Sequence, residues 1–120
     1  MMEKRRDDSV YLQHILDSIA HVENFSNGRL ERLHELSEPW FATIRALQIM
    51  SESATKLSDE AKQAMPEMEW HRIRGFRNIL VHDYLGDVDP VIVRSVIEIE
   101  LPKLKKAVQR TLERGDSYNE

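Results

Sequence analysis

The sequence has 120 residues, a formal net charge of −4 and no cysteine. This is enough chain for one domain, residues 1–120, with a core that needs no cross-links. The missing cysteines exclude disulfides, thiolate metal sites and a thiol nucleophile, and the negative charge argues against a general nucleic-acid coat, which depends on many cationic contacts. No apolar run approaches the roughly 20 residues of a membrane helix, and the first residues do not resemble a signal peptide. We therefore expect a cytoplasmic protein with no membrane contact.

Few helix breakers and many charged residues favour an all-α fold: the chain has 4 Gly, 4 Pro and 32% charged residues. A first helix is predicted over about residues 6–25, because apolar residues recur there at three- and four-residue spacing. His14, Asp17 and His21 share another face of this helix. A metal site there would need ligands from elsewhere, so we interpret these residues as solvated.

Two further helices are predicted in the next part of the chain. One is short and covers residues 30–36, and the other is long and begins near Glu38, where Ser37 can cap it and Pro39 is tolerated in the first turn. The long helix has a broad apolar side. Its charged residues Arg45 and Glu52 have two interpretations, pairing across helices or support for a functional site.

A short helix beginning at Ser58 must end before Pro66. The next helix is predicted from residue 67 or 68 to residue 81 or 82, with Ile73, Phe76 and Leu80 as its apolar stripe. Gly75 lowers the stability of this helix by about 1 kcal/mol relative to alanine. Close approach of another helix or room for a nucleotide would explain a glycine here, and we favour close approach.

The last helix is predicted to begin at Asp89-Pro90 and to bend at Pro102. Its core stripe consists of Val93, Ile97, Leu101, Leu104, Val108 and Leu112. A second side, formed by Ile92, Val96 and Ile99, is also apolar. One helix then has more hydrophobic surface than a single partner covers, which favours a two-fold homodimer.

The chemistry is concentrated in residues 71–84. His82 has the intrinsic pKa range for proton transfer near neutrality, and Arg77 can grip two phosphoryl oxygens with its planar fork. Asn78, on the same helical face as His82, can orient the imidazole or donate to a phosphate. Arg74 is a candidate RNA contact, and Asp83 is either a cap or a partner for an arginine. Taken alone, an arginine and a histidine at this spacing are more often surface or helix-cap residues.

The pattern Arg77, four residues, His82, one residue, Tyr84 resembles the Arg-x4-His-x-Tyr motif of the HepT-like toxins of the HEPN superfamily. Further segments of similarity are residues 45–58, 66–70 and 101–105, spread over roughly half of the chain. One departure is Ser51-Glu52-Ser53, where relatives usually carry Gly-Glu-Ala.

This resemblance implies a HEPN-like bundle of long antiparallel helices plus short helices. It also implies the toxin of a type VII toxin-antitoxin system, a class formerly assigned to type II. The toxin would be a metal-independent endoribonuclease with Arg77, Asn78 and His82 at a dimer cleft, and it would need no cofactor. The implied antitoxin is an MntA-like nucleotidyltransferase that transfers AMP to Tyr84.

Two other functions remain open on the sequence alone. HEPN-like domains also serve as non-catalytic binding partners of nucleotidyltransferases. A DNA-binding regulator using Arg72, Arg74 and Arg77 is weaker, because these arginines do not share one exposed face with polar residues that read bases.

Overall fold

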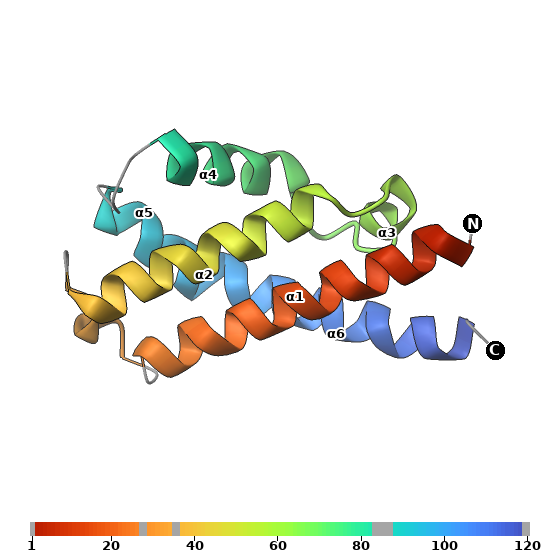
Figure 1. Cartoon of the computed structure of the whole chain (residues 1–120), viewed down its shortest axis with the longest axis horizontal. Coiled ribbons are helices and arrows are strands. Elements are labelled where there is room, and N and C mark those ends of the chain that lie inside the picture. Colours follow the sequence, from red (N-terminus) through yellow and green to blue (C-terminus); the bar gives the residue numbers. More distant parts are fainter. Residues whose placement is uncertain (1, 27–28, 35–36, 83–87, 119–120) are drawn as a thin grey trace.

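The computed structural model describes residues 2–26, 29–34, 37–82 and 88–118, and these contain helices and no strands (Figure 1). The elements are α1 (Met2–Ser26), η1 (Leu30–Arg32), α2 (Glu38–Thr55), α3 (Asp59–Gln63), α4 (Trp70–His82), α5 (Pro90–Ser95), the π-helical turn η3 (Val96–Glu100) and α6 (Leu101–Tyr118). The all-α prediction is confirmed.

Three predicted helix starts are confirmed by capping hydrogen bonds. The hydroxyls of Ser37 and Ser58 each accept from the backbone N–H three residues further on, at 3.2 and 3.1 Å. The Asp89 carboxylate accepts from the N–H two residues further on, at 2.9 Å. Each cap satisfies a donor that the first turn of a helix leaves without a partner. These bonds fix where α2, α3 and α5 begin.

Three boundaries differ from the sequence prediction. Helix α1 already begins at Met2. The predicted helix over residues 30–36 is a 3₁₀ turn at Leu30–Arg32 in its described part, and residues 35–36 lie outside the described chain. Helix α4 begins at Trp70 instead of residue 67 or 68. The preceding turn is closed by a bond from the Met68 N–H to the Met65 carbonyl, 3.2 Å, and both methionines are buried. The chain thus forms a turn that buries both methionines at the position where the sequence predicted the first turn of the helix.

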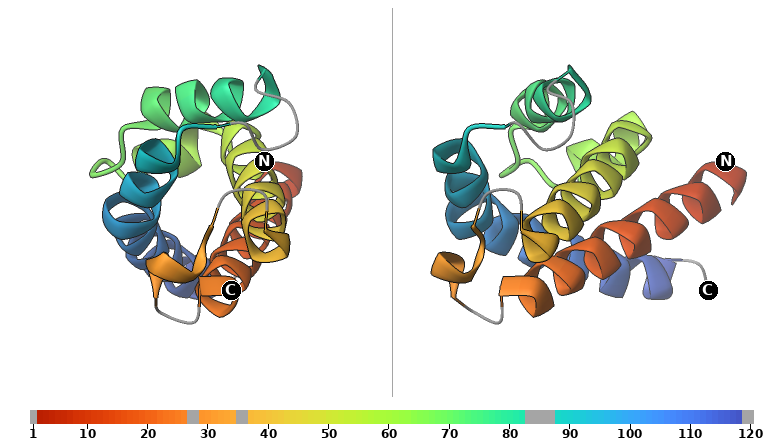
Figure 2. Two further views of the ribbon diagram at one scale, coloured as in Figure 1. Left: turned by 90° about the vertical axis from the view of Figure 1, so that its left-hand side faces the viewer. Right: turned by 60° about the vertical axis from the view of Figure 1, so that its left-hand side comes forward.

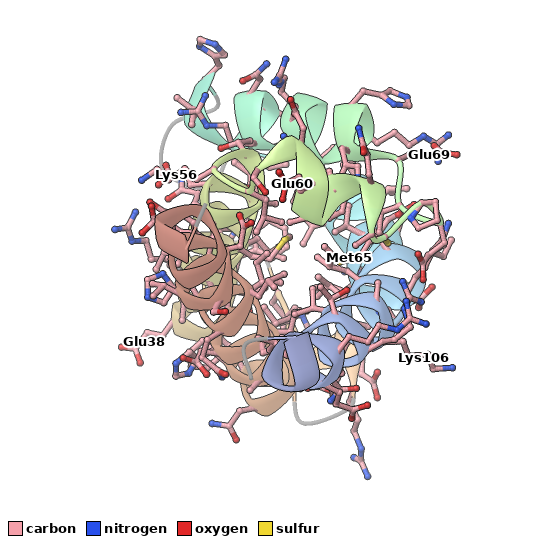
Figure 3. The ribbon with its side chains drawn as sticks, turned by 90° about the vertical axis from the view of Figure 1, so that its right-hand side faces the viewer. Glu38, Lys56, Glu60, Met65, Glu69 and Lys106 are labelled. Atoms are coloured by element: carbon pink, nitrogen blue, oxygen red, sulfur yellow. The ribbon has the colours of Figure 1, made fainter. Side chains whose placement is uncertain are left out.

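The long helices run antiparallel and surround one core. Helix α1 packs against α2 and α6, and α4 packs against α2. Figure 2 shows α4, α2, α1, α6 and α5 following one another around the core. The largest fully buried side chains come from these helices, from the residue after η1 and from the α3–α4 turn: Ile15, Val22, Leu33, Trp40, Leu47, Met65, Leu80, Val93, Leu104 and Val108. In Figure 3, Met65 lies inside the bundle, whereas Glu38 and Lys106 lie at its edge.

Pro102 disrupts the last helix in the turn before the proline. Instead of one bent helix, the chain forms α5, a π-helical turn and α6, and the Leu101 N–H bonds to the Val96 carbonyl five residues back. A proline has no N–H to donate, and its ring clashes with the carbonyl four residues before it. The wider π turn accommodates the proline while the chain stays helical.

Two polar contacts hold the α2–α4 connection against the bundle. Asp8 of α1 accepts from the backbone N–H of Ser58 at 2.8 Å and from its hydroxyl at 2.6 Å. Arg110 of α6 donates to both carboxylate oxygens of Glu67 and, at 3.1 Å, to the Ala64 carbonyl. These hydrogen bonds from Arg110 lower the pKa of Glu67 from 4.5 to about 2.

The Glu67–Arg110 pair predicts a stability contribution that acid removes. The folded-state pKa of Glu67 is depressed, so the stabilisation is present above about pH 4.5 and is lost as the pH falls toward about 2. Because both side chains are about one third exposed, solvent screening keeps the contribution of this pair to stability small. We expect Arg110→Gln to lower the urea-unfolding free energy at about pH 6 and to lower it less at about pH 3.

Lys106→Gln is the matched control, since it removes a positive charge from the same helix at an exposed position that has no ion pair among the described residues. An Arg110→Gln effect that does not shrink at the lower pH contradicts the assignment.

Candidate functional site

Helix α4 turns one face to the core and leaves the other to solvent. Ile73, Phe76 and Leu80 are buried, which confirms the predicted stripe. The polar residues at positions 71, 74, 78 and 82 recur at steps of three and four residues, and all four are exposed. They therefore follow one another along the solvent face of the helix. Packing of the apolar stripe on α2 therefore places Asn78 and His82 outward.

Arg77 lies beside Asn78 and has no acidic partner among the described residues. Its Nη1 donates to the Asn78 Oδ1 at 3.4 Å, a weak contact. Arg77 is half-buried, and its Nε is a buried nitrogen with no hydrogen-bond partner within the described part of the chain. A buried donor left unpaired is costly in a folded protein. Because Arg77 forms no ion pair with a described residue, a phosphate that binds it would not have to displace a carboxylate.

His82 is the last residue of α4 and is exposed. The described part of the helix reaches the predicted end, and the residues after it lie outside the described part of the chain. Because the helix is continuous, His82 is about 40° around the axis from Asn78 and about 140° from Arg77. No hydrogen bond or ion pair joins His82 to another described residue. Within one chain, Asn78 therefore lies near Arg77 and near His82, but Arg77 and His82 point away from each other.

Two of the predicted site residues cannot be placed. Asp83 and Tyr84 lie outside the described residues, as does the predicted turn around Gly86. The described chain resumes at Val88, which is buried.

The end of α4 is tied to α2 by Gln48, a residue that the sequence analysis missed. Its Nε2 donates to the Leu80 carbonyl at 3.2 Å, and its Oε1 accepts from Arg45 at 3.4 Å. Arg45 therefore makes a contact within its own helix and, through Gln48, reaches the motif helix. The signal in the sequence was a polar residue on the broad apolar side of the long helix. Glu52 makes no side-chain hydrogen bond or ion pair within the described residues.

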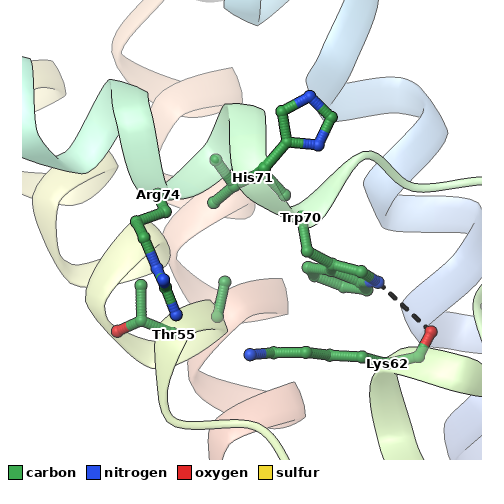
Figure 4. Close-up of a pocket in the computed structure, with 7 residues that line it drawn as sticks. Thr55, Lys62, Trp70, His71 and Arg74 are labelled. Atoms are coloured by element: carbon green, nitrogen blue, oxygen red, sulfur yellow. Dashed lines mark hydrogen bonds between the residues drawn. The ribbon is translucent and has the colours of Figure 1, made fainter. Parts of the chain in front are cut away.

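A small pocket of about 200 Å³ lies between α4 and the α2–α3 region. Its lining includes Thr55, Lys62, Trp70, His71 and Arg74 (Figure 4). The Trp70 indole N–H donates to the Lys62 carbonyl at 3.2 Å, which fixes the ring at the wall. The sequence analysis named Arg74 as a candidate site residue, but neither Lys62 nor Trp70. Both lie outside the motif, and Lys62 is brought to Arg74 only by the fold.

A larger apolar groove, about 520 Å³, lies between α4 and the α5–η3 segment. Gly75, Phe76, Ile79 and Ile92 are among its lining residues. The prediction that Gly75 allows another helix of the same chain to approach closely is wrong: a Cβ added there would have nothing within 4 Å. The glycine instead borders open space.

Of the predicted second apolar side of the last helix, Ile92 and Ile99 are exposed in the single chain, whereas Val96 is half-buried against the core. Ile99 is 62% exposed and Ile92 38% exposed, and Val91 next to them is 69% exposed. This agrees with the expectation of more apolar surface than the bundle itself covers.

The described residues hold no group of three or more histidines, aspartates or glutamates arranged to bind a metal ion. His14 is exposed, Asp17 accepts from Gln13 at 3.0 Å, and His21 stacks on Phe25. Among the described helices, none is long and apolar enough to cross a bilayer.

Comparison with known proteins gives the family. The sequence model of the family described as "Ribonuclease HepT-like" matches residues 15–111. "Putative RNase MJ1380" of Methanocaldococcus jannaschii is 29% identical over 114 residues, which cover 88% of this chain and 96% of the relative. "Putative RNase TTE0752" of Caldanaerobacter subterraneus subsp. tengcongensis is 30% identical, covering 87% and 93%.

"Probable ribonuclease HepT" of Thermococcus cleftensis is 29% identical over 102 residues, which cover 84% of this chain and 92% of the relative. No solved structure matches the chain. The family match extends over most of the bundle, from the middle of α1 to the middle of α6, and it includes the whole of α4. With its all-α bundle and the motif helix at its surface, this chain belongs to the HepT-like ribonuclease family.

Proposed function

We propose that this protein is a toxin-type endoribonuclease that cleaves RNA without a metal ion, with Arg77, Asn78 and His82 as its catalytic residues. The observation that carries the proposal is the solvent face of α4. Asn78 and His82 are exposed there, Arg77 has an unpaired buried donor beside them, and the chain belongs to a ribonuclease family. The relatives' names, which call them ribonucleases, support the same activity.

The proposed reaction needs proton transfer and charge stabilisation. A base removes the proton of the ribose 2′-hydroxyl, and the oxygen attacks the adjacent phosphorus. The bond from phosphorus to the 5′-oxygen breaks, and an acid protonates this leaving oxygen. Histidine can serve in both proton transfers. Arg77 stabilises the negative charge on the phosphoryl oxygens through its planar fork, and Asn78 orients His82 or donates to the phosphate.

We propose that the active unit is a two-fold homodimer whose two motif segments face one cleft. Within one chain, Arg77 and His82 point about 140° apart, and each chain supplies one histidine of the motif. Two chains would supply one base and one acid. The groove beside Gly75 and the exposed Val91, Ile92 and Ile99 give an apolar surface that a second copy can cover.

We also propose that an MntA-like nucleotidyltransferase neutralises the toxin by transferring AMP to Tyr84, as in a type VII system. Support comes from the resemblance of the Arg77-to-Tyr84 pattern to the Arg-x4-His-x-Tyr motif and from the place of Tyr84 two residues after His82 in the sequence. An AMP group would bring a phosphodiester anion and an adenosine next to Arg77 and His82. It would compete with RNA for the site and neutralise part of its positive charge.

The cleavage prediction uses purified protein, labelled RNA and EDTA. Wild-type cleavage should persist in EDTA, because the proposed mechanism uses side chains alone. His82→Ala should lower the rate about 10²–10⁴-fold, the usual contribution of general acid–base catalysis, and Arg77→Ala should also lose most activity. His14→Ala is the matched control, since His14 is an exposed histidine on α1, and it should retain full activity.

Strict dependence on added magnesium or manganese contradicts the mechanism. A well-folded wild type that binds a nucleotidyltransferase but cuts no RNA favours the alternative of a non-catalytic binding partner.

The dimer prediction uses two inactive variants. Light scattering should give twice the 14.1 kDa mass of the chain. If the sites are shared, an excess of either variant, Arg77→Ala or His82→Ala, should lower the activity of wild-type subunits by more than simple dilution, because a mixed dimer lacks one side chain of the shared cleft. Full activity of a monomer at high dilution would contradict the dimer proposal.

The modification prediction concerns Tyr84. Coexpression with the cognate nucleotidyltransferase should add the mass of AMP to the peptide that contains Tyr84. Tyr84→Phe lacks the acceptor hydroxyl, so it should remain toxic in the presence of the antitoxin. Tyr11→Phe, a change on α1 far along the sequence, should be neutralised like the wild type. Neutralisation of a toxic Tyr84→Phe protein, with no mass shift on the wild type, would instead indicate inhibition by complex formation.

A further inference from the structure

The pocket beside Trp70 brings two cationic side chains from different helices to one concave space. Lys62 comes from α3 and Arg74 from α4, and both line the pocket with His71 (Figure 4). Figure 4 shows Arg74 reaching toward Thr55 and the Lys62 side chain extending below Trp70 into the same space. Neither cation forms an ion pair with a described residue. The acidic residues Asp59 and Glu60 of α3 do not line this pocket.

The lack of acidic partners distinguishes Lys62 and Arg74 from three basic residues of α4 and α6 that form ion pairs. Arg72 pairs with Glu69 at 2.8 Å, Lys105 pairs with Glu23 at 3.1 Å, and Arg110 pairs with Glu67. In a chain of net charge −4, two unpaired cations facing one concavity create a local positive potential. Such a site favours an anion.

The size of the pocket limits which anion it can hold. At about 200 Å³, it is smaller than the roughly 300–1,000 Å³ of typical small-molecule sites, so it fits a phosphate group better than a whole nucleotide. Thr55 forms part of the wall, but its hydroxyl already donates to the Glu52 carbonyl at 2.7 Å. Arg74 and Lys62 are therefore the donors to the phosphate, with His71 at the pocket wall.

The pocket is connected to the motif by the polar stripe of α4. Arg74, Asn78 and His82 follow one another on the exposed face at steps of four residues. From Arg74 to His82 the helix rises by about 12 Å, which is too far for one phosphate to contact both ends. A phosphate held in the pocket is therefore not the one within reach of His82, and the two would belong to different positions of one strand.

We infer that the Lys62–Arg74 pocket is an accessory phosphate subsite, which holds the RNA strand at a phosphate other than the one cleaved. The inference rests on the proposed ribonuclease function for the identity of the strand. The subsite raises affinity for longer RNA and takes no part in the bond-breaking step.

Binding tests the subsite without relying on cleavage. The probe is a uridine oligonucleotide with 2′-O-methyl groups, which has no attacking hydroxyl. We expect Lys62→Gln to weaken its binding several-fold and to reduce the slope of log K against log salt by about 0.7, the value for one phosphate contact with a single strand. Arg74→Gln should have a similar effect, and Lys62→Arg should restore binding because the cation is kept.

Lys106→Gln is the control for the loss of one positive charge, since Lys106 is exposed on α6 and does not line this pocket. It should leave both the affinity and the salt slope unchanged. Circular dichroism of each variant verifies that the helices are intact. Equal effects of Lys62→Gln and Lys106→Gln would mean a general charge effect and overturn the inference.

Cleavage of substrates of two lengths separates the subsite from the active site. A dinucleoside monophosphate has a single phosphate, which the motif must occupy, so Lys62→Gln should cleave it with unchanged kcat/KM. A longer RNA should show a lower kcat/KM through a higher KM. Equal loss on both substrates would make Lys62 part of the active site or its support, and overturn the inference.

The experiments distinguish failure of the proposed ribonuclease function from failure of the subsite inference. If the wild type cuts no RNA, the binding measurements still decide whether the pocket holds a strand phosphate. If the wild type cuts RNA but Lys62→Gln binds the oligonucleotide as tightly as the wild type, the subsite is wrong and the ribonuclease proposal stands. The last measurement is calorimetry with uridine 5′-monophosphate. If the wild type binds this nucleotide tightly, and Lys62→Gln abolishes that binding but leaves the affinity for the oligonucleotide unchanged, the pocket binds a free nucleotide instead of the strand.

Discussion

Packing of α4 on α2 is the constraint on which the rest of the candidate site depends. Burial of Ile73, Phe76 and Leu80 fixes the rotation of α4 about its own axis. Once this rotation is fixed, the residues on the opposite face must point to solvent, because a helix repeats every 3.6 residues. The same apolar contacts that stabilise the bundle thus decide that Asn78 and His82 are exposed. Site geometry and core packing cannot change independently in this helix.

The exposed face of α4 also reconciles an acidic protein with an anionic substrate. The net charge of −4 disfavours nonspecific adsorption along a nucleic acid. Ion pairs such as Lys105–Glu23 and Arg110–Glu67 neutralise cations elsewhere on the bundle. Lys62, Arg74 and Arg77 remain without such partners among the described residues. Lys62 of α3 and Arg74 of α4 thereby bring unpaired positive charge together at one pocket, a local exception to the negative net charge.

The sequence predicted local features well and contacts between distant segments poorly. Caps at Ser37, Ser58 and Asp89 are visible in the sequence because a hydroxyl or carboxylate acts on backbone only two or three residues away. The stripe of α4 is visible for the same reason. The pocket formed by Lys62 and Arg74 is not, because it depends on how α3 packs beside α4.

Two further results show where local rules give incomplete answers. Pro102 was expected to bend a helix, but proline rules do not specify whether the strain appears as a kink or as a π turn, and here it is taken up by residues 96–100. Gly75 was assigned to close packing, yet it borders a groove. A glycine permits close approach without requiring it, so its neighbour can only be found in the fold.

Gln48 explains how the bundle controls the end of the motif helix. The last four carbonyls of a helix have no partner within the helix, and the Leu80 carbonyl belongs to this group in α4, which ends at His82. Gln48 of α2 supplies a donor at 3.2 Å. The bond requires a polar side chain on the largely apolar side of α2. The free-energy cost of partly burying this side chain is reduced because its other polar atom, Oε1, accepts from Arg45. The end of α4 is consequently fixed to the core helix, two residues before the imidazole of His82.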